Sequence, residues 1–162
     1  MESDGATRTA KVEAPRGFHS ARVDEKGRLK LPAIFQKFLR EDLGENKVFV
    51  TTLDVSTVRI YPISLWEQNE KFFEQSDDPE LAENVSFLAN HYGADSEIDP
   101  QGRILVPTGL RRDLGIENQT VWLQHYRGRI DVLGKEQYDG RLARARLNPL
   151  DSLHSLERKG LR

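Results

Sequence analysis

The sequence predicts an α+β fold in which two tandem copies of one ββαββ unit pack as a pseudo-dimer around a small β-barrel. Residues 24–32 read DEKGRLKLP, and residues 99–107 read DPQGRILVP, so one motif begins again 75 residues later. Strand and helix patterns follow each other in the same order around both copies. Because half of a small barrel leaves strand edges unpaired, each unit is expected to supply strands that the other lacks.

The first copy begins after residues 1–16, a polar stretch without hydrophobic periodicity that we expect to be a disordered tail. Alternating apolar and β-branched residues then predict four strands, which cover residues 18–23, 28–31, 47–53 and 58–62. Pro32 opens a short helix between the second and third of these strands, and Gly44 ends it. The apolar residues of this helix fall on one face: Ile34, Phe35, Phe38 and Leu39.

Two longer helices are expected between the copies. The first is predicted to start at the capping box Ser64-x-x-Glu67, and the second starts after Asp78 with Pro79 in its first turn. The first helix carries apolar residues for its buried side: Leu65, Trp66, Phe72 and Phe73. If this aromatic face is partly exposed, we expect it to form a subunit interface.

The second copy repeats the strand and helix order of the first. Its predicted strands cover residues 95–98, 103–106, 120–126 and 129–134, with a short helix opened by Pro107 before the last two. A final helix is expected over residues 135–146, ended by Asn148-Pro149. The expected organisation is therefore a tail (1–16), a first unit with two helices (17–94), a second unit with a C-terminal helix (95–147) and a polar tail (148–162).

Several functional classes are not expected from this sequence. The chain has 162 residues and no cysteine, which excludes disulfides, thiolate metal sites and a cysteine nucleophile. It contains no HExxH, nucleophile-elbow, phosphate-loop or GxGxxG pattern, so we expect no catalytic residues, metal, cofactor or small-molecule substrate. The N-terminus lacks the apolar segment of a secretory signal, and no run approaches the roughly 18 apolar residues of a spanning helix. A cytoplasmic protein without membrane contact is expected.

Charge is distributed unevenly although the formal net charge is only −2. Residues 16–40 hold seven cations and two acidic residues, whereas residues 64–84 hold seven acidic residues and one lysine. The cations of the first region are Arg16, Arg22, Lys26, Arg28, Lys30, Lys37 and Arg40. This asymmetry suits a chain that presents one basic face to a polyanion.

The repeated motif has both a structural and a functional interpretation. Its glycines suit a turn with positive φ, its aspartates can accept hydrogen bonds across that turn, and its prolines open the following helix. These motif residues are Asp24, Gly27, Pro32, Asp99, Gly102 and Pro107. A salt bridge from Asp24 to Arg28 would explain one copy by structure alone. However, Arg28 has basic neighbours, and two such hairpins side by side would form a ribbon with paired arginines that fits the DNA major groove. The predicted DNA-contacting residues are Arg28, Arg103, Lys26, Lys30 and Arg22.

The segments VDEKGRLKLP, EIDPQGRILVP, VRIYPISLWE and NHYGAD resemble the MraZ family of bacterial regulators over residues 16–138. This resemblance implies an AbrB-like swapped-hairpin barrel, ring-shaped homo-oligomers and a cytoplasmic, nucleoid-associated location. It further implies binding to double-stranded DNA at short direct repeats upstream of a division and cell-wall gene cluster, with Arg28 and Arg103 as contact residues. The first short helix departs from the family because it lacks the arginine that is common there.

Two other functions are kept as alternatives. An oligomeric scaffold that binds protein without touching DNA would use the aromatic helix face described above. An AbrB-like antitoxin would share the barrel, but such proteins normally carry one barrel half per chain, so the tandem repeat argues against it.

Overall fold

The computed structural model describes residues 13–162, and it confirms the predicted α+β class with antiparallel sheets. Most of the expected disordered tail, residues 1–12, lies outside the described residues. The strands are β1 (His19–Arg22), β2 (Arg28–Lys30), β3 (Lys47–Thr51), β4 (Val58–Pro62), β5 (Ala94–Glu97), β6 (Arg103–Leu105), β7 (Thr120–Tyr126) and β8 (Arg129–Leu133). The helices are α2 (Ala33–Lys37), the π-helical turn η1 (Phe38–Asp42), α3 (Ile63–Gln75), α4 (Pro79–Tyr92), α5 (Thr108–Asp113), α6 (Lys135–Ala145) and α7 (Pro149–Arg158).

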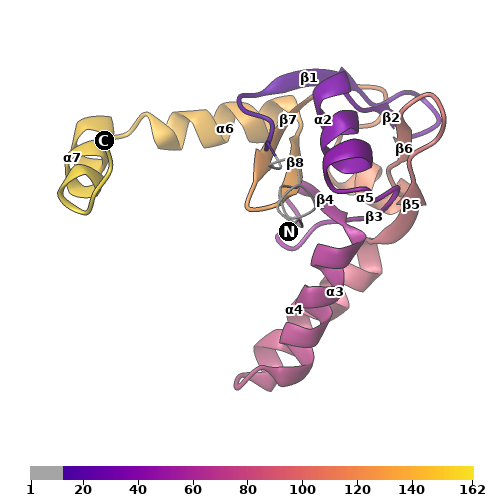
Figure 1. Ribbon diagram of the computed structural model, residues 1–162, viewed down its shortest axis with the longest axis horizontal. Helices are drawn as coiled ribbons and strands as arrows, with labels where there is room; N and C mark the ends of the chain where they lie inside the picture. The colour runs from indigo at the N-terminus through magenta and orange to yellow at the C-terminus, as the bar shows by residue number, and fades with distance from the viewer. Residues whose placement is uncertain (1–12) are drawn as a thin grey trace, which may run out of the picture.

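The two halves of the chain interleave their strands (Figure 1). A six-stranded sheet has the order β1-β7-β8-β4-β3-β5, and a separate two-stranded ribbon joins β2 to β6. Strands β1, β2, β3 and β4 therefore each pair with a strand from the second half, namely β7, β6, β5 and β8. Local sequence patterns predict strands but do not choose these distant partners.

The expected closed barrel is not seen among the described strands, because the two sheets are not joined by continuous ladders. Between β1 and β2 the chain makes only an isolated bridge from Val23 to Leu29. Between β5 and β6, the Leu105 N–H donates to the Ser96 hydroxyl at 3.0 Å instead of to a strand carbonyl. The tight turns that enter β2 and β6 thus interrupt the pairing that would close a barrel.

Both halves contribute to one hydrophobic core. Leu29 of β2 and Ile104 of β6 lie opposite each other in the ribbon, and both are buried. Phe35 from the first half and Leu110 from the second are also fully buried in this core. Since each half buries its apolar side chains against the other, neither half has a complete core alone.

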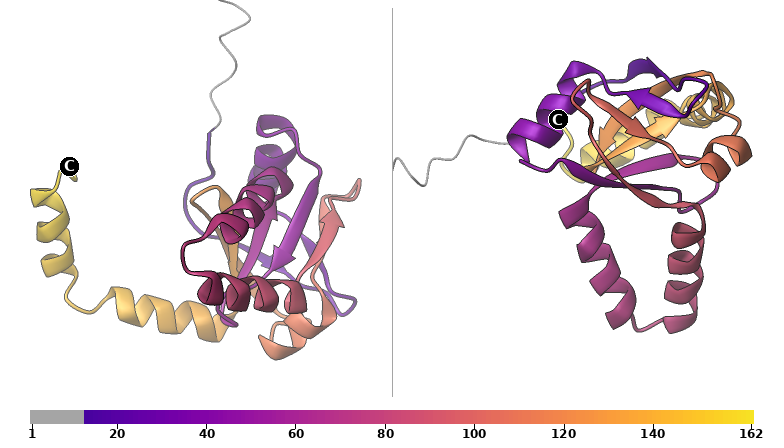
Figure 2. Two further views of the ribbon diagram at one scale, coloured as in Figure 1. Left: turned by 90° about the horizontal axis from the view of Figure 1, so that it is seen from below. Right: turned by 90° about the vertical axis from the view of Figure 1, so that its right-hand side faces the viewer.

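A second aromatic cluster anchors the hairpin formed by α3 and α4, which stands away from the sheets (Figure 2). The buried Trp66 stacks on Phe49 with ring centroids 4.7 Å apart. The predicted capping box is wrong, because α3 begins at Ile63 and the Ser64 N–H donates to the Glu45 carboxylate at 2.9 Å. The expected burial of the whole aromatic face is also wrong, since the Phe72 side chain is 67% exposed.

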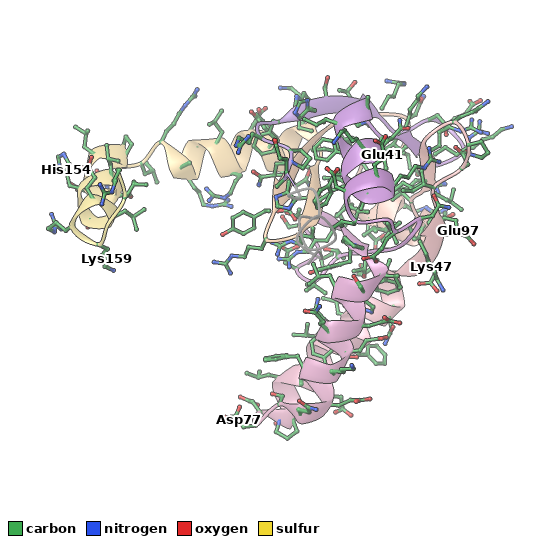
Figure 3. All side chains as sticks on the ribbon, in the orientation of Figure 1. Glu41, Lys47, Asp77, Glu97, His154 and Lys159 are labelled. Atoms are coloured by element: carbon green, nitrogen blue, oxygen red, sulfur yellow. The ribbon has the colours of Figure 1, made fainter. Side chains whose placement is uncertain are left out.

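The C-terminal residues contain a helix where we expected a polar tail. Asn148 has a left-handed φ of 50° and turns the chain after α6, and Pro149 then starts α7. Helix α7 lies at the far end of α6, and its side chains stand clear of the sheets, as His154 and Lys159 show (Figure 3). Within residues 13–162, no helix is long and apolar enough to cross a membrane.

Candidate nucleic-acid interface

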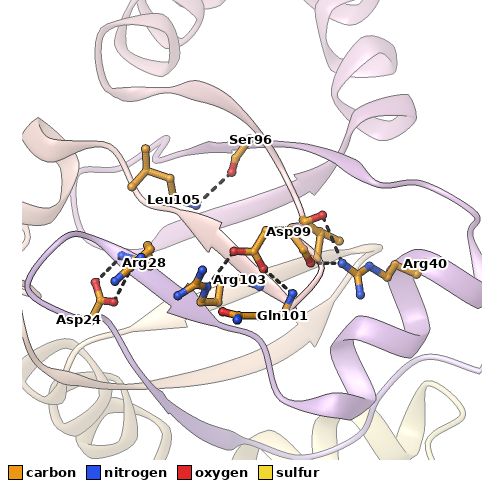
Figure 4. A network of polar contacts seen from close by, with 9 residues as sticks. Asp24, Arg28, Arg40, Ser96, Asp99, Gln101, Arg103 and Leu105 are labelled. Carbon is orange, nitrogen blue, oxygen red and sulfur yellow. Dashed lines mark hydrogen bonds and ion pairs between the residues drawn. The ribbon is translucent and has the colours of Figure 1, made fainter.

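The ribbon of β2 and β6 brings the two copies of the motif together. Its antiparallel register places Arg28 opposite Leu105 and Lys30 opposite Arg103. The residues between them, Leu29 and Ile104, are buried, so the alternation of a strand leaves the other four side chains on the outer face. Three cations from two distant segments, Arg28, Lys30 and Arg103, therefore share one short face. Figure 4 shows Arg28 and Arg103 on the two strands of the ribbon.

Each motif aspartate holds its own turn and its own arginine. The Oδ1 atom of Asp24 accepts hydrogen bonds from the N–H groups of Lys26 at 2.9 Å and Arg28 at 2.8 Å. Its Oδ2 atom accepts from the Arg28 Nε at 3.0 Å. The salt-bridge interpretation is thus correct for the first copy, and it applies equally to the second.

In the second copy, the Oδ1 atom of Asp99 accepts from the N–H groups of Gln101 at 2.9 Å and Arg103 at 2.8 Å. Its Oδ2 atom accepts from the Arg103 Nε at 2.8 Å. Both arginines are bound through Nε, and their Nη atoms make no hydrogen bond to another described residue. The aspartates orient the guanidinium groups and leave their outer edges available to a ligand.

The same contacts set the charge of the two carboxylates. The backbone N–H of Arg28 is the main cause that lowers the pKa of Asp24, and the Arg28 side chain contributes further against the opposing effect of burial. The backbone N–H and the side chain of Arg103 lower the pKa of Asp99 in the same way. Both aspartates are therefore ionised at neutral pH, which keeps the arginines in their observed orientation.

The motif glycines are required for two reasons, because their backbone has a positive φ and because another side chain packs closely against each of them. Gly27 has a φ of +85°, and a Cβ there would lie 2.0 Å from Nη1 of Arg111. Gly102 has a φ of +81°, and a Cβ there would lie 2.2 Å from Nε2 of Gln36. A helix residue of each half thus covers the turn of the other half.

Sequence reasoning did not identify these covering residues. Nε2 of Gln36 donates to the Leu31 carbonyl at 2.6 Å, and Nη1 of Arg111 donates to the Val106 carbonyl at 2.6 Å. Gln36 and Arg111 each lie four residues after the motif proline, and that equivalent spacing was the available signal. The glutamine performs in the first half the contact that arginine performs in the second.

A further arginine secures the second turn. Nη2 of Arg40, in the middle of the π-helical turn, donates to the carbonyl of Ile98 at 3.2 Å and to the carbonyl of Asp99. This contact ties the first half to the entry of β6 (Figure 4). Arg40 therefore positions the turn and is not one of the outward cations of the ribbon.

The remaining predicted residues differ in their surroundings. Lys26 is exposed in the first turn, and Lys30 is exposed on β2. Arg22 lies on β1, where its Nη2 donates to the carbonyl of Asn118 at 2.9 Å and to its side-chain oxygen at 2.7 Å. Within residues 13–162, no group of three or more His, Asp or Glu side chains is placed to hold a metal ion.

Several proteins with similar sequences share one name. No family model matches the chain. The transcriptional regulator MraZ of Acidobacterium capsulatum is 41% identical over 108 residues, which cover 65% of this chain and 73% of that protein. The transcriptional regulator MraZ of Koribacter versatilis is 32% identical over 124 residues, or 76% of this chain and 78% of that protein. The protein of the same name from Neisseria meningitidis serogroup A is 31% identical over 132 residues, or 80% of this chain and 85% of that protein.

Proposed function

The chain belongs to the MraZ family of transcriptional regulators, and from this membership we propose that it is a sequence-specific DNA-binding regulator that contacts DNA with the outer face of the β2–β6 ribbon. A two-stranded ribbon has the width of the DNA major groove. Arg28 and Arg103 would contact base edges, and the exposed Lys26 and Lys30 would contact phosphates. A regulator acting in this way would be associated with the nucleoid.

The observation that carries this proposal is the pairing of Lys30 with Arg103 on the exposed face, with Arg28 on the same face. Like charges directly opposite each other in a ladder destabilise a sheet. A ribbon that keeps three cations together is therefore suited to a polyanion that neutralises them. The free Nη edges match the O6 and N7 acceptors of guanine, which arginine contacts in the major groove.

The two arginines are not expected to contribute equally. The Arg28 side chain is 38% exposed, whereas the Arg103 side chain is 29% exposed and faces another cation. The second turn also carries Pro100 and Gln101 where the first carries Glu25 and Lys26. Arg28 is therefore expected to make the larger contribution to affinity.

The test is the affinity of the purified chain for its own upstream DNA, measured by fluorescence anisotropy at one salt concentration. Arg28→Ala is expected to weaken binding by about 1 to 3 kcal/mol, which is roughly 5- to 150-fold per site, and Arg103→Ala less. Lys71→Ala is the matched control, since it removes one exposed positive charge from α3. Circular dichroism must show that each variant is folded.

Wild-type affinity in the folded Arg28→Ala variant would reject the ribbon as the DNA contact. If neither arginine variant changed the affinity for DNA, an oligomeric protein-binding scaffold would be favoured instead. The exposed Phe72 on α3 is the observation that supports this alternative. Loss of folding in Arg28→Ala would show that the salt bridge to Asp24 is the main role of this arginine.

The proposal includes a ring-shaped homo-oligomer that engages short direct repeats. One ribbon neutralises only a few phosphates, which gives weak binding at physiological salt. Joining several copies raises the effective concentration for the next repeat and adds a factor of roughly 10² to 10⁴ to affinity. Successive repeats must then face the same side of the duplex, about 10 to 10.5 base pairs apart.

Repeat spacing tests this multivalent mechanism. A single repeat is expected to bind weakly and two phased repeats tightly, and an insertion of about five base pairs, half a helical turn, should return affinity toward the single-repeat value. Equal affinity for the three DNA sites at one salt concentration would reject the ring. The Arg28→Ala and Arg103→Ala variants would still test the arginine contacts separately.

A further inference from the structure

Helix α7 carries an apolar face that no other part of residues 13–162 covers. Leu150, Leu153 and Leu156 recur at three-residue spacing along the helix, so they lie along one side of it. Their exposed fractions are 64%, 40% and 52%. The helix stands at the far end of α6, away from the sheets (Figure 1). A repeated leucine face held in solvent is typical of an interaction surface.

Helix α6 fixes the direction in which this face is presented. Tyr138 of α6 packs against Phe18 at a centroid distance of 5.0 Å and against Trp122 of β7 at 5.3 Å. The near end of α6 is therefore anchored on the sheet, while its far end carries α7 outward. The α3–α4 hairpin leaves the body in a different direction, with Asp77 at its tip (Figure 3). The leucine face cannot reach this hairpin within one chain in this arrangement.

The outer face of α4 offers the complementary surface. Phe87 is 75% exposed, and Glu83 and Glu80 lie four and seven residues before it, on the same side of the helix. A shallow depression beside Phe87 is lined by Glu83, Asn90 and His91. This face joins an exposed aromatic ring to a row of carboxylates.

Charge complementarity points to a second copy of the chain as the partner of the leucine face. Residues 149–162, the C-terminal arm that contains α7, hold three cations, Arg158, Lys159 and Arg162, and two acidic residues, whereas α4 holds Glu80 and Glu83 and no lysine or arginine. A leucine face that ends in a group of cations and an acidic helix with an exposed phenylalanine match in both charge and polarity. Both surfaces are present on every copy of the chain, so a second copy supplies the partner that each requires.

We infer that the leucine face of α7 in one copy docks on the outer face of α4 in the next copy. The contact joins different surfaces of the two copies, so it is heterologous and can close a ring. This inference rests on the self-association proposed above and assigns its surfaces. It involves the C-terminal arm and not the DNA-contacting ribbon.

The test is the molar mass of the full chain by light scattering over a concentration series, relative to 18.5 kDa for one copy. The wild type is expected to be a multiple of this mass. A triple variant, Leu150→Ser with Leu153→Ser and Leu156→Ser, and a single variant, Phe87→Ser, are each expected to raise the dissociation constant at least 10-fold. Phe72→Ser is the matched control, because Phe72 is similarly exposed but lies on α3 beside Arg127 and Arg129.

A charge exchange makes the test specific to the proposed pair of surfaces. Glu80→Lys with Glu83→Lys is expected to weaken assembly, and adding Arg158→Glu with Lys159→Glu is expected to restore it at least in part. Restoration by charges on the opposite surface would not follow from a general loss of stability. Circular dichroism of each variant checks that the fold is kept.

Three results would overturn the inference. Wild-type mass in both the leucine variant and Phe87→Ser would show that assembly uses other surfaces. Dissociation of Phe72→Ser, with Phe87→Ser still assembled, would move the contact to α3. Loss of binding to anionic lipid vesicles by the leucine variant, at unchanged mass, would make α7 a membrane contact.

The DNA proposal has separate readouts. The leucine variant is expected to bind a single repeat with wild-type affinity, since its ribbon is intact. Its affinity for two phased repeats is expected to fall toward the single-repeat value. A wild type that is already a single copy at 18.5 kDa would reject both self-association and the arm contact, while the arginine variants would still decide the ribbon.

Discussion

Lys30 of β2 lies directly opposite Arg103 of β6, so that cations from the two halves of the chain form a cross-strand pair on the exposed face of the ribbon. The pair exists only because the halves interleave, since the two residues belong to different copies of the motif. Asp99 holds Arg103 through its Nε at 2.8 Å, and Lys30 makes no salt bridge with another described residue. A cross-strand pair of cations is unfavourable for the stability of the ribbon, and it supports the proposed contact with a polyanion.

Lys30→Glu is therefore expected to stabilise the chain while weakening DNA binding. The new carboxylate would face Arg103 and replace a repulsive cross-strand pair with an attractive one, worth roughly 0.2 to 1 kcal/mol. Urea unfolding measures the stability, and anisotropy with the upstream DNA measures the affinity. Lys26→Glu, in the turn outside this pair, is the control that should weaken DNA binding without stabilising the fold. A Lys30→Glu variant that is less stable than wild type would contradict this account.

Gly27→Ala is expected to destabilise the chain more than Gly44→Ala. Both glycines have positive φ, +85° and +67°, so alanine at either position adopts a left-handed conformation that costs about 1 to 2 kcal/mol. Only at Gly27 does the new Cβ also displace the buried Arg111 guanidinium, which donates to the Val106 carbonyl. Around Gly44, no atom of a described residue other than its chain neighbours lies within 4 Å of the added Cβ. Equal losses of unfolding free energy in denaturant would show that the covering contact contributes little.

Residues 17–94 alone are not expected to form a stable monomer. In the full chain, β1, β2 and β4 pair with β7, β6 and β8, all of which this fragment lacks. Leu29 would also lose Ile104 as its neighbour in the core. We expect the fragment to dimerise or aggregate, because unpaired strand edges and an incomplete core are unfavourable in water. A monodisperse monomer with cooperative unfolding, measured by light scattering and urea titration, would show that the two units fold independently.

Acid is expected to destabilise the chain partly through the two motif aspartates. Hydrogen bonds lower the folded-state pKa of Asp24 and Asp99 below the ordinary value of 3.8, so they stabilise the fold above that pH. This stabilisation is lost as the pH falls from about the ordinary value through the lowered folded value. The double variant Asp24→Asn with Asp99→Asn takes up no proton at these positions, so its unfolding free energy should fall less steeply below pH 3.8. Parallel pH profiles for the two proteins would contradict the assignment.

The local features of the motif were predictable from sequence because they depend on residues close in the chain. The spacing of Asp24, Gly27 and Arg28 is enough to specify a turn closed by its own carboxylate. Repetition of that spacing at Asp99 made the second turn equally predictable. The role of Asp78 as a helix cap was also predictable, and its side chain accepts from the Leu81 N–H at 3.4 Å.

Features that depend on distant neighbours were not predictable in the same way. Ser64 has the sequence of a helix cap, but Glu45 lies close enough in the fold to take its hydrogen bonds. Helix α7 was predicted to be a polar tail, because a helix of 10 residues is marginal by itself and its leucines are not buried by the part of the chain that the structure describes. The equal spacing of Gln36 and Arg111 after the motif prolines marked them as counterparts, but it did not show that each covers the glycine of the other half.

By itself, the sequence determined the α+β class, the order of the elements up to α6, and the two turns in which an aspartate holds an arginine. Only the tertiary structure decided that β2 pairs with β6, that the sheets stay open, and that Lys30 faces Arg103. The physical reason is that turns and strand propensities arise from interactions over a few residues. The choice of strand partner instead depends on how Leu29 and Ile104 are buried together across the whole chain.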